Sequence, residues 1–573
     1  MRKLALVLCL TSLALTLFLA ALDVVIVITL YETIGEKFRD YARIGWLVTG
    51  YALPNALFTL LWGRIASILG LKTSLTFSII IFEIGSLIVA VSNSLGMIIG
   101  GRVVAGCGGS GIQSLVFVVG TSLVEERNRG MVITVLGLAF AVAFAVGPVI
   151  GGAFTENVSW RWCFYINLPI GGLALTMLTF SYNTTGKTVQ ETIAHNCQEV
   201  QSYRYGQWAT TSFWHQASTF MIFDLDFIGF ALSSTGFVLF MLGLTFGGNV
   251  YAWNSGTVIS YLAVGVILVL LWLVFDFKLL NYWAMWCHRK EPTPLLRRSL
   301  CLRPGIYTSS IANLFTCFSF NMQTVYVVQL YQLVFNRGPT AASIHLWAFL
   351  IATMISVIVI GKAAAIFGQI KPAIVFGATC GLIGSGLMTL IENNSTTGNV
   401  IGYCILPGAA FGSIMQGTLL SAQVQVDRED EKFQTMFIEA TAINTFAKSL
   451  GFSFGGVMAT MIFTNSVKNQ IQSAPTGIPA FSSVEALIAY RGQSYDGPDS
   501  LLSLIFVKAI KDVMYAALGC YGIVFIASLF TSNRRLRLPT KVDNSDAATR
   551  EKSLPGGDKS QLAPQSTSEN DIN

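Results

Sequence analysis

The chain has 573 residues, of which 53% are hydrophobic and only 12% are charged, and its formal net charge is +6. A soluble domain carries about 25% charged residues and cannot bury this much apolar surface, so the composition predicts a polytopic membrane protein. The basic residues are spread along the chain rather than gathered in one patch, which argues against a nucleic-acid partner and favours a role in membrane orientation.

The first apolar segment covers residues 5–30 and contains one carboxylate, Asp23. Its basic start and the small residues near its middle also fit a cleaved signal peptide. The apolar pattern resumes after Asp23, however, so the whole segment is long enough to form one membrane-spanning helix. We therefore expect a retained first spanner with an acidic side chain at membrane depth.

Further apolar windows of about 20 residues follow along the chain, and together they predict an all-α membrane protein with fourteen transmembrane helices. The windows after the first are 44–63, 74–92, 97–122, 130–153, 161–182, 227–247, 257–279, 305–327, 343–363, 372–391, 399–422, 440–464 and 511–531.

The longer polar stretches divide these windows into two six-helix bundles and two extra helices. We expect an N-terminal bundle at 1–182, a cytoplasmic linker at 183–226, two extra helices at 227–279, a cytoplasmic loop at 280–304, a C-terminal bundle at 305–531 with an external loop at 465–509, and a tail at 532–573. The tail is polar and without aromatic residues, a composition that is typical of disorder.

Loop charges predict the orientation. Basic residues recur in alternate loops and fall on the same side of the membrane as Arg2 and Lys3, which the positive-inside rule makes cytoplasmic. The opposite loops contain the sequons of Asn157, Asn393 and Asn394, which are glycosylation candidates only if they face the exterior or a lumen. The two signals agree.

GCGGSG at 106–111 fits the dinucleotide-binding pattern GxGxxG. That pattern needs a preceding strand and a helix whose N-terminus meets a pyrophosphate, whereas this copy lies inside an apolar spanner. Glycines at this spacing allow helix backbones to approach closely in lipid, so we expect helix packing and no nucleotide. The Cys and His spacings contain no CxxC or HxxH pair, so no metal site is predicted.

Four charged residues lie deep in predicted spanners, and they are Asp23, Glu83, Arg102 and Lys448. A charge at the bilayer centre costs about 2.5–3.5 kcal/mol on the insertion scale, so few chains keep one without a use. A functional site and a structural ion pair are both open explanations. A carboxylate at this depth suits proton coupling, because it can take up a proton on one side and release it on the other.

Polar amide side chains also occur at spanner depth. They can hydrogen-bond a substrate in a cavity, or equally join one helix to another. The candidates are Asn55, Gln113, Asn313, Asn321, Gln323, Gln329, Gln332 and Gln416.

AVGPVIGG at 145–152 places helix-bending residues inside one spanner. Pro148 removes a backbone donor and kinks a helix, and its neighbour Gly147 adds freedom at the same point. Gly151 and Gly152 allow close packing. We expect this bend to serve as a pivot.

Three motifs in this order resemble those of a known family. GRIASILGLK at 63–72, RVVAGCGGSG at 102–111 and GPVIGG at 147–152 are similar to the loop motif, the fourth-spanner motif and the antiporter motif of the major facilitator superfamily. With fourteen predicted spanners, the chain resembles its fourteen-helix drug:proton antiporter family. This resemblance implies the major facilitator fold, with no enzymatic activity, no ATP, and protons as the coupling ion in place of a cofactor.

The resemblance also implies roles for individual residues. Asp23 and Arg102 would face the central cavity, with Arg102 taking part in proton transfer. The loop motif retains Gly63, Gly70 and Lys72, but its acidic position is Ser67 and the following basic position is Ile68. In the first spanner, Val25 replaces the usual Thr.

Several segments, among them IGWLVTGYAL and LYQLVF, are similar to the fungal branch of the family that exports crystal violet and other cationic dyes. The azole-resistance and basic amino acid branches are similar as well. We therefore expect export of small hydrophobic cations from the plasma membrane, with the vacuolar membrane as the alternative. Asp23, with Glu83 as a further candidate, would exchange protons for drug. A channel or a non-transporting membrane sensor on the same scaffold stays open.

Overall fold

The computed structural model describes residues 2–38, 46–182, 220–248, 251–286, 293–427, 432–473, 487, 497 and 499–536. The predicted linker lies mostly outside these residues, and so does most of the predicted tail. Within the described residues the chain is helical, apart from turns and a single bridge between Gly247 and Tyr251.

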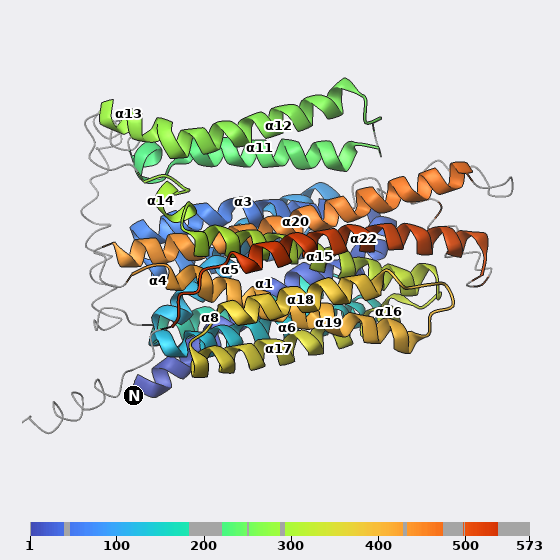
Figure 1. Cartoon of the computed structure of the whole chain (residues 1–573), viewed down its shortest axis with the longest axis horizontal. Coiled ribbons are helices and arrows are strands. Elements are labelled where there is room, and N and C mark those ends of the chain that lie inside the picture. Colours follow the sequence, from blue (N-terminus) through green and yellow to red (C-terminus); the bar gives the residue numbers. More distant parts are fainter. Residues whose placement is uncertain are drawn as a thin grey trace, which may run out of the picture. The chain divides into compact units, whose positions relative to one another are not determined.

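The first six predicted spanners are observed as helices (Figure 1). They comprise α1 Arg2–Ile26, followed by a turn at Val27–Leu30 and the short α2 Tyr31–Phe38, then α3 Trp46–Leu69, α4 Leu71–Ala90, α5 Leu95–Ser122, α6 Arg129–Asn157 after a turn at Glu126–Asn128, α7 Trp162–Tyr165 and α8 Asn167–Ser181.

The remaining elements follow the predicted order. They are a π-helical segment at Phe220–Asp224, α11 Phe227–Phe246, α12 Gly256–Val274, a second π-helical segment at Phe275–Leu279, α13 Leu280–Trp286, α14 Arg298–Cys301, α15 Pro304–Leu333, α16 Pro339–Ile344, α17 Trp347–Phe367, α18 Lys371–Met388, α19 Thr397–Val424, α20 Phe433–Ser473 and α22 Leu501–Leu529.

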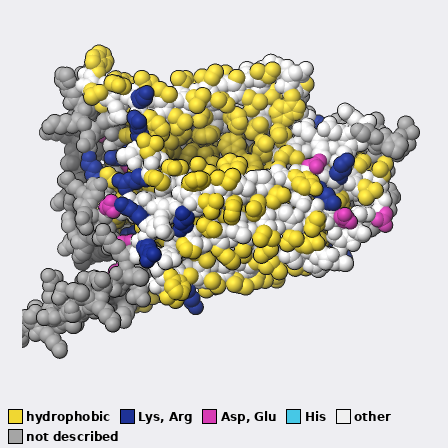
Figure 2. All heavy atoms as spheres, viewed as in Figure 1, with side chains coloured by type: hydrophobic (Ala, Val, Ile, Leu, Met, Phe, Trp, Pro, Cys, Tyr) yellow, Lys and Arg dark blue, Asp and Glu magenta, His cyan; other side chains and the backbone are white. Residues whose placement is uncertain are grey.

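Among the described residues, thirteen helices are long and apolar enough to cross a membrane. The remaining predicted spanner, 305–327, corresponds to α15, which is 30 residues long but carries more polar side chains. Figure 2 shows the surface that such helices need: apolar side chains cover the middle of the visible face, and Lys and Arg gather near one end. That distribution is the one expected of a bilayer-embedded protein with one basic face.

Close helix packing accounts for the glycines of α5. A Cβ added to Gly108 would lie 2.3 Å from the backbone N of Phe82 in α4, and one added to Gly106 would lie 2.5 Å from the carbonyl oxygen of Tyr51 in α3. The backbones of these helices therefore touch where only hydrogen fits. The GxGxxG pattern is a packing motif, as the sequence predicted.

The two halves of the chain meet along several helices. The first half contributes α3, α5 and α6, which contact α20, α17 and α19 of the second half. The extra helices α11 and α12 lie side by side at one edge of the bundle (Figure 1), and α11 contacts both α3 and α20. The extra pair thus packs on a seam between the halves.

The loop predicted at 465–509 is shorter than expected, because the helices on both sides extend into that range. Helix α20 continues to Ser473, and α22 already begins at Leu501. Phe463 and Val467 of α20 are buried in the same apolar cluster as Phe506 of α22. This buried contact keeps both helices extended beyond their apolar sequence windows, because packing rather than composition sets where they end.

Candidate functional site

A small cavity lies between the halves. Its lining residues come from α5 and α6 on one side and from α15, α17, α19 and α20 on the other, and they include Phe117, Asn313, Gln416, Asn444, Thr445 and Lys448. Its volume is about 20 Å³, which is enough for a water molecule but far below the roughly 300 Å³ of a drug-sized pocket. The structure therefore shows the halves closed around this point.

Lys448 is the charged residue of the cavity. Only 3% of the residue is exposed, and its Nζ has no hydrogen-bond partner among the described residues. The ammonium lies 5.4 Å from the ring centre of Phe140 and 5.7 Å from that of Phe117. Two aromatic faces from the first half thus stabilise a cation that is carried by the second half.

Amide groups beside Lys448 are only partly satisfied. Asn313 Nδ2 donates to Asn444 Oδ1 at 2.9 Å, and Gln416 Nε2 donates to the carbonyl of Gly130 at 2.9 Å. Asn444 Nδ2 and Gln416 Oε1 have no partner in the described part of the chain. An unsatisfied buried polar group is costly, so the donor, the acceptor and the ammonium that lack partners among the described residues make this cavity the candidate site.

Asp23 and Arg102 form a buried ion pair inside the first half. Arg102 Nη1 contacts Asp23 Oδ2, and Arg102 Nε donates to the carbonyl of Leu47 at 2.9 Å. The guanidinium also stacks over the ring of Tyr51, 4.5 Å from its centre. The structure brings these two predicted residues together, but neither lines the cavity.

Glu83 lies near this ion pair. Asn167 joins the region by donating to Ser86 Oγ of α4 at 3.1 Å and to Asp23 Oδ1 at 3.5 Å. The carboxylate of Glu83 packs on Gly171 of α8, where an added Cβ would lie 1.7 Å from Oε1. Both carboxylate oxygens are buried and have no hydrogen-bond partner among the described residues. Glu83 is therefore an acid that no basic residue in the described part of the chain neutralises.

The other predicted amides join helices rather than line the cavity. Asn321 Nδ2 donates to the carbonyl of Phe452 at 2.6 Å, and Gln323 Nε2 donates to Ser385 Oγ at 2.6 Å. Both bonds lie within the second half. The residues Asn55, Gln113 and Gln329 are likewise not among those that line the cavity. Of the amides that the sequence predicted as cavity residues, Asn313 and Gln416 line the cavity.

The residues of the loop motif lie where α3 ends and α4 begins. Gly70 has φ of +85°, which an L-residue rarely adopts. Lys72 Nζ donates to the carbonyl of Thr179 at the end of α8, at 2.9 Å. Gly63 faces α20, and an added Cβ would meet the Cβ of Ala442 at 2.8 Å. This glycine therefore sets how closely the halves approach.

The antiporter motif lies in α6, with Pro148 inside the helix. An added Cβ at Gly147 would lie 3.3 Å from Val25 of α1, so the position where Val25 replaces Thr packs directly on the motif. Gly151 accepts a hydrogen bond from Thr155 Oγ1 at 2.6 Å. The role of Gly147, Pro148, Gly151 and Gly152 as a pivot stays a prediction.

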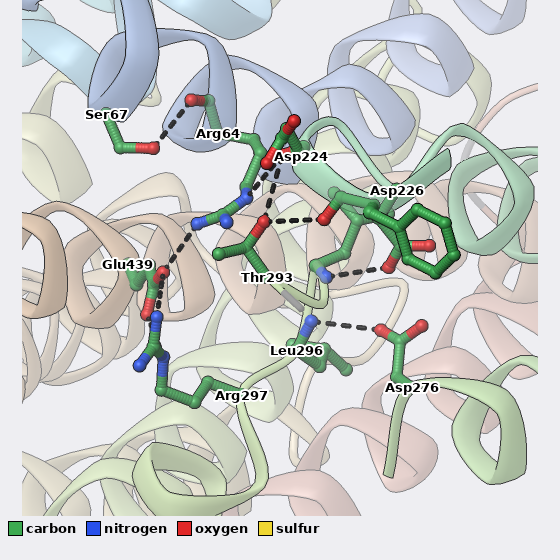
Figure 3. A network of polar contacts seen from close by, with 11 residues as sticks. Arg64, Ser67, Asp224, Asp226, Asp276, Thr293, Leu296, Arg297 and Glu439 are labelled. Carbon is green, nitrogen blue, oxygen red and sulfur yellow. Dashed lines mark hydrogen bonds and ion pairs between the residues drawn. The ribbon is translucent and has the colours of Figure 1, made fainter. Parts of the chain in front are cut away.

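A clasp of three side chains joins the halves near the ends of α3 and α20 (Figure 3). Arg64 Nη1 of α3 lies 2.8 Å from Glu439 Oε1 of α20, and Arg297 Nε lies 2.9 Å from Glu439 Oε2. The sequence analysis did not identify this clasp, because Arg64 and Glu439 are 375 positions apart and no local pattern pairs them. Ser67, at the acidic position of the loop motif, only donates to the carbonyl of Arg64 at 2.7 Å.

Residues 293–297 form a strap that ties the clasp to the extra helices (Figure 3). The backbone amide of Leu295 donates to Asp226 at 2.9 Å, and that of Leu296 donates to Asp276 at 3.0 Å. Asp226 caps the start of α11, and burial raises its pKa, although the backbone amides of Leu295 and Gly229, which donate to this carboxylate, oppose the shift. Arg297, at the end of the strap, then reaches Glu439.

Two of the predicted glycosylation candidates, Asn157 and Asn393, donate hydrogen bonds at the surface. Asn157 Nδ2 donates to the carbonyl of Ala153 at 3.0 Å, and Asn393 Nδ2 donates to Asp499 at 2.7 Å. Both of these hydrogen bonds are exposed to solvent. Glycosylation at Asn157, Asn393 or Asn394 stays a prediction.

The chain is similar to known proteins in both sequence and fold. Residues 13–280 match the family model of the Major Facilitator Superfamily. Among curated relatives from Saccharomyces cerevisiae, Protein SGE1 is 54% identical (94% of this chain, 99% of the relative), Vacuolar basic amino acid transporter 5 is 45% identical (95% and 93%), and Azole resistance protein 1 is 42% identical (92% and 88%).

The fold is similar to that of a solved structure, the proton:xylose symporter XylE, with a TM-score of 0.56. The match covers 94% of this chain and 98% of XylE, at 12% sequence identity. At that identity the likeness concerns the arrangement of helices alone.

Proposed function

The chain belongs to the major facilitator superfamily, and from that premise we propose that it is a proton-driven exporter of small hydrophobic cations. The observation that carries this proposal is the ammonium of Lys448 over Phe117 and Phe140. The cavity between the halves already accommodates one positive charge by means of aromatic faces. A flat aromatic cation offers the same charge and adds stacking area.

Transport in this fold needs the halves to move. At about 20 Å³ the cavity admits no drug, so a substrate enters only when one end of the seam opens. Alternate opening at the two ends around a fixed midplane site is the general scheme for transporters of this kind. We take α15 as the fourteenth crossing, since it lies between α20 and α22 in the second half.

Coupling to protons is assigned to the acids of the first half. Asp23 already has a counter-charge in Arg102, whereas the carboxylate oxygens of Glu83 have no partner among the described residues. A buried acid without a counter-charge is stable there only when it carries a proton. Glu83 beside the Asp23–Arg102 pair is therefore the best-placed proton carrier, and Asp23 holds the arginine in position.

The test is efflux of crystal violet from cells or proteoliposomes with an imposed pH gradient. We expect wild-type protein to export the dye against its gradient, and Glu83→Gln and Asp23→Asn to lose most of that export at normal membrane levels. Full export by both variants would refute the coupling role. Absence of dye export by the wild-type protein would refute the function itself.

A second candidate is transport of basic amino acids, and two observations favour it. The relative named Vacuolar basic amino acid transporter 5 is 45% identical to this chain. In addition, Lys448 Nζ and Asn444 Nδ2 are open donors that suit the carboxylate of an amino acid. Counterflow of labelled lysine in the same proteoliposomes distinguishes the candidates, and counterflow of either substrate excludes a non-transporting sensor.

The membrane of residence is proposed to be the plasma membrane, with the vacuolar membrane as the alternative. An exporter of toxic cations protects the cell by acting at its surface, whereas storage of basic amino acids takes place across the vacuolar membrane. Fluorescence microscopy of the tagged full-length chain decides between the two locations.

A further inference from the structure

We propose that Lys448 makes the cavity a site for a single positive charge, so that a hydrophobic cation binds only as Lys448 gives up its proton. This inference rests on the proposed function. It adds a proton-exchanging group at the substrate itself, separate from Glu83 in the first half. It also states which substrates are coupled to this proton, namely cations without a carboxylate.

The position of Lys448 is the first step. The residue is carried by α20 of the second half, and its ammonium faces Phe117 of α5 and Phe140 of α6 in the first half. These rings are the aromatic surface that a flat cation would use. An incoming cation therefore competes with the ammonium for the same two faces.

Among the residues that the structure describes, the surroundings of Lys448 contain no counter-charge. The described side chains that line the cavity from α6, α17 and α19 are apolar or amides. On α15, Asn313 is an amide and the Cys317 thiol is a titratable group, and on α20 the neighbours are Asn444 and Thr445. With no acid among these side chains, a second positive charge would meet the ammonium unscreened in a water-poor site.

Release of the proton resolves this conflict with balanced chemistry. One N–H bond of the ammonium breaks, the proton passes to water on the side to which the cavity is open, and the nitrogen keeps the electron pair. The neutral amine is then an acceptor. Asn444 lies four residues before Lys448 on the same helix face and has an Nδ2 donor without a partner. Deprotonation thus supplies the acceptor that this amide lacks.

The direction of transport follows from the order of events. A cation that binds from the cytoplasm expels the proton of Lys448 to the cytoplasm. After the cation leaves outside, Lys448 takes up a proton there and returns with it. Through Lys448, each cycle moves one proton inward for each cation moved outward. A substrate with a carboxylate instead pairs with the protonated Lys448 and releases no proton from it.

The experiment measures protons released when crystal violet or tetraphenylphosphonium binds to the purified full-length protein in weakly buffered detergent solution. The wild-type protein is expected to release about one proton more per bound cation than Lys448→Met. Its affinity should rise about tenfold per pH unit at the pH values where Lys448 is protonated before the cation binds, since binding and proton release are linked. The affinity of Lys448→Met for the cation should lack this tenfold change per pH unit.

Two further variants make the result decisive. Lys448→Arg keeps a charge that cannot be removed, so it should bind the cation at least tenfold more weakly than wild type while remaining folded. Lys468→Met is the matched control, because this lysine lies on the same helix and donates to the carbonyl of Gly248, away from the cavity. It should release protons as the wild type does.

Equal proton release by wild type and Lys448→Met would overturn the inference, and so would wild-type affinity in Lys448→Arg. In both cases the wild-type protein still binds the cation, so the proposed function survives. If the wild-type protein binds neither cation, the proposed function fails and this inference falls with it. Should Lys448→Met fail to fold, the arginine variant alone decides.

Discussion

At the scale of single residues, four deep charges have two different fates. Asp23 and Arg102 neutralise each other inside the first half, together with the carbonyl of Leu47. Lys448 and Glu83 have no hydrogen-bond partner for their charged atoms among the described residues. A paired charge mainly holds helices in place, whereas an unpaired buried charge is stabilised when its protonation state changes or when it binds a ligand.

The ion pair predicts an asymmetric stability effect. Asp23→Asn leaves Arg102 charged and buried, so we expect a loss of about 3–5 kcal/mol in stability. The double variant Asp23→Asn with Arg102→Met removes both charges and should regain a large part of that loss. Thermal unfolding of the purified proteins measures both. Additive losses in the double variant would contradict direct pairing of the two residues.

At the scale of elements, the extra helices have a mechanical connection to the seam. Phe230 of α11 packs on Phe58 of α3 with ring centres 4.8 Å apart, and Phe237 packs on Phe446 of α20 at 5.9 Å. The strap at 293–297 adds polar contacts from the base of α11 and α12 to Glu439. The pair is therefore fastened to both halves at once.

The clasp predicts which end opens when Glu439 is neutralised. Glu439→Gln removes the partner of Arg64 and Arg297, so we expect the halves to separate more often at this end. Spin labels at the exposed positions Ile68 and Leu302 should then show a larger share of long distances.

The matched control for this experiment is Asp427→Asn. Asp427, which follows α19, pairs with Arg534, which follows α22, at 3.1 Å, and their side chains are 57% and 47% exposed. This variant removes the same charge but leaves Arg64 and Arg297 paired with Glu439, so it should leave the distance distribution unchanged. An equal shift in both variants would mean that the clasp does not hold the halves together.

The glycines of α5 predict a second effect at this scale. Gly108→Ala places a methyl group 2.3 Å from the backbone of Phe82, so α4 and α5 must move apart, at a cost of about 1–3 kcal/mol. Gly100→Ala on the same helix meets nothing within 4 Å and should be neutral. Thermal unfolding in detergent compares them, and equal stability of the two variants would contradict the packing role.

At the scale of the whole helical unit, residues 1–536, the halves are joined at several depths. Arg64 and Glu439 form an ion pair at one level. At a second level, Gln416 Nε2 donates to the carbonyl of Gly130. At a third, Trp347 Nε1 donates to the carbonyl of Ala145 at 3.2 Å. The cavity at Lys448 lies between such contacts. A substrate can reach it only if the contacts on one side break while those on the other side hold.

The sequence by itself determined the fold class and most helix positions. Apolar windows of membrane length and the spacing of Gly and Pro carry this information locally, since lipid leaves the backbone few alternatives to a helix. It also selected Asp23, Glu83, Arg102 and Lys448 as unusual, because the cost of a charge at membrane depth depends on position along one helix.

Only the tertiary structure decided which charges are paired and which lie in the cavity. Asp23 and Arg102 are 79 positions apart, and Arg64 and Glu439 are 375 apart. No local pattern specifies such contacts, which arise from the packing of whole helices. For the same reason Lys448, rather than Asp23, lies at the boundary of the halves, since that place is defined by helices α5, α6, α19 and α20 together.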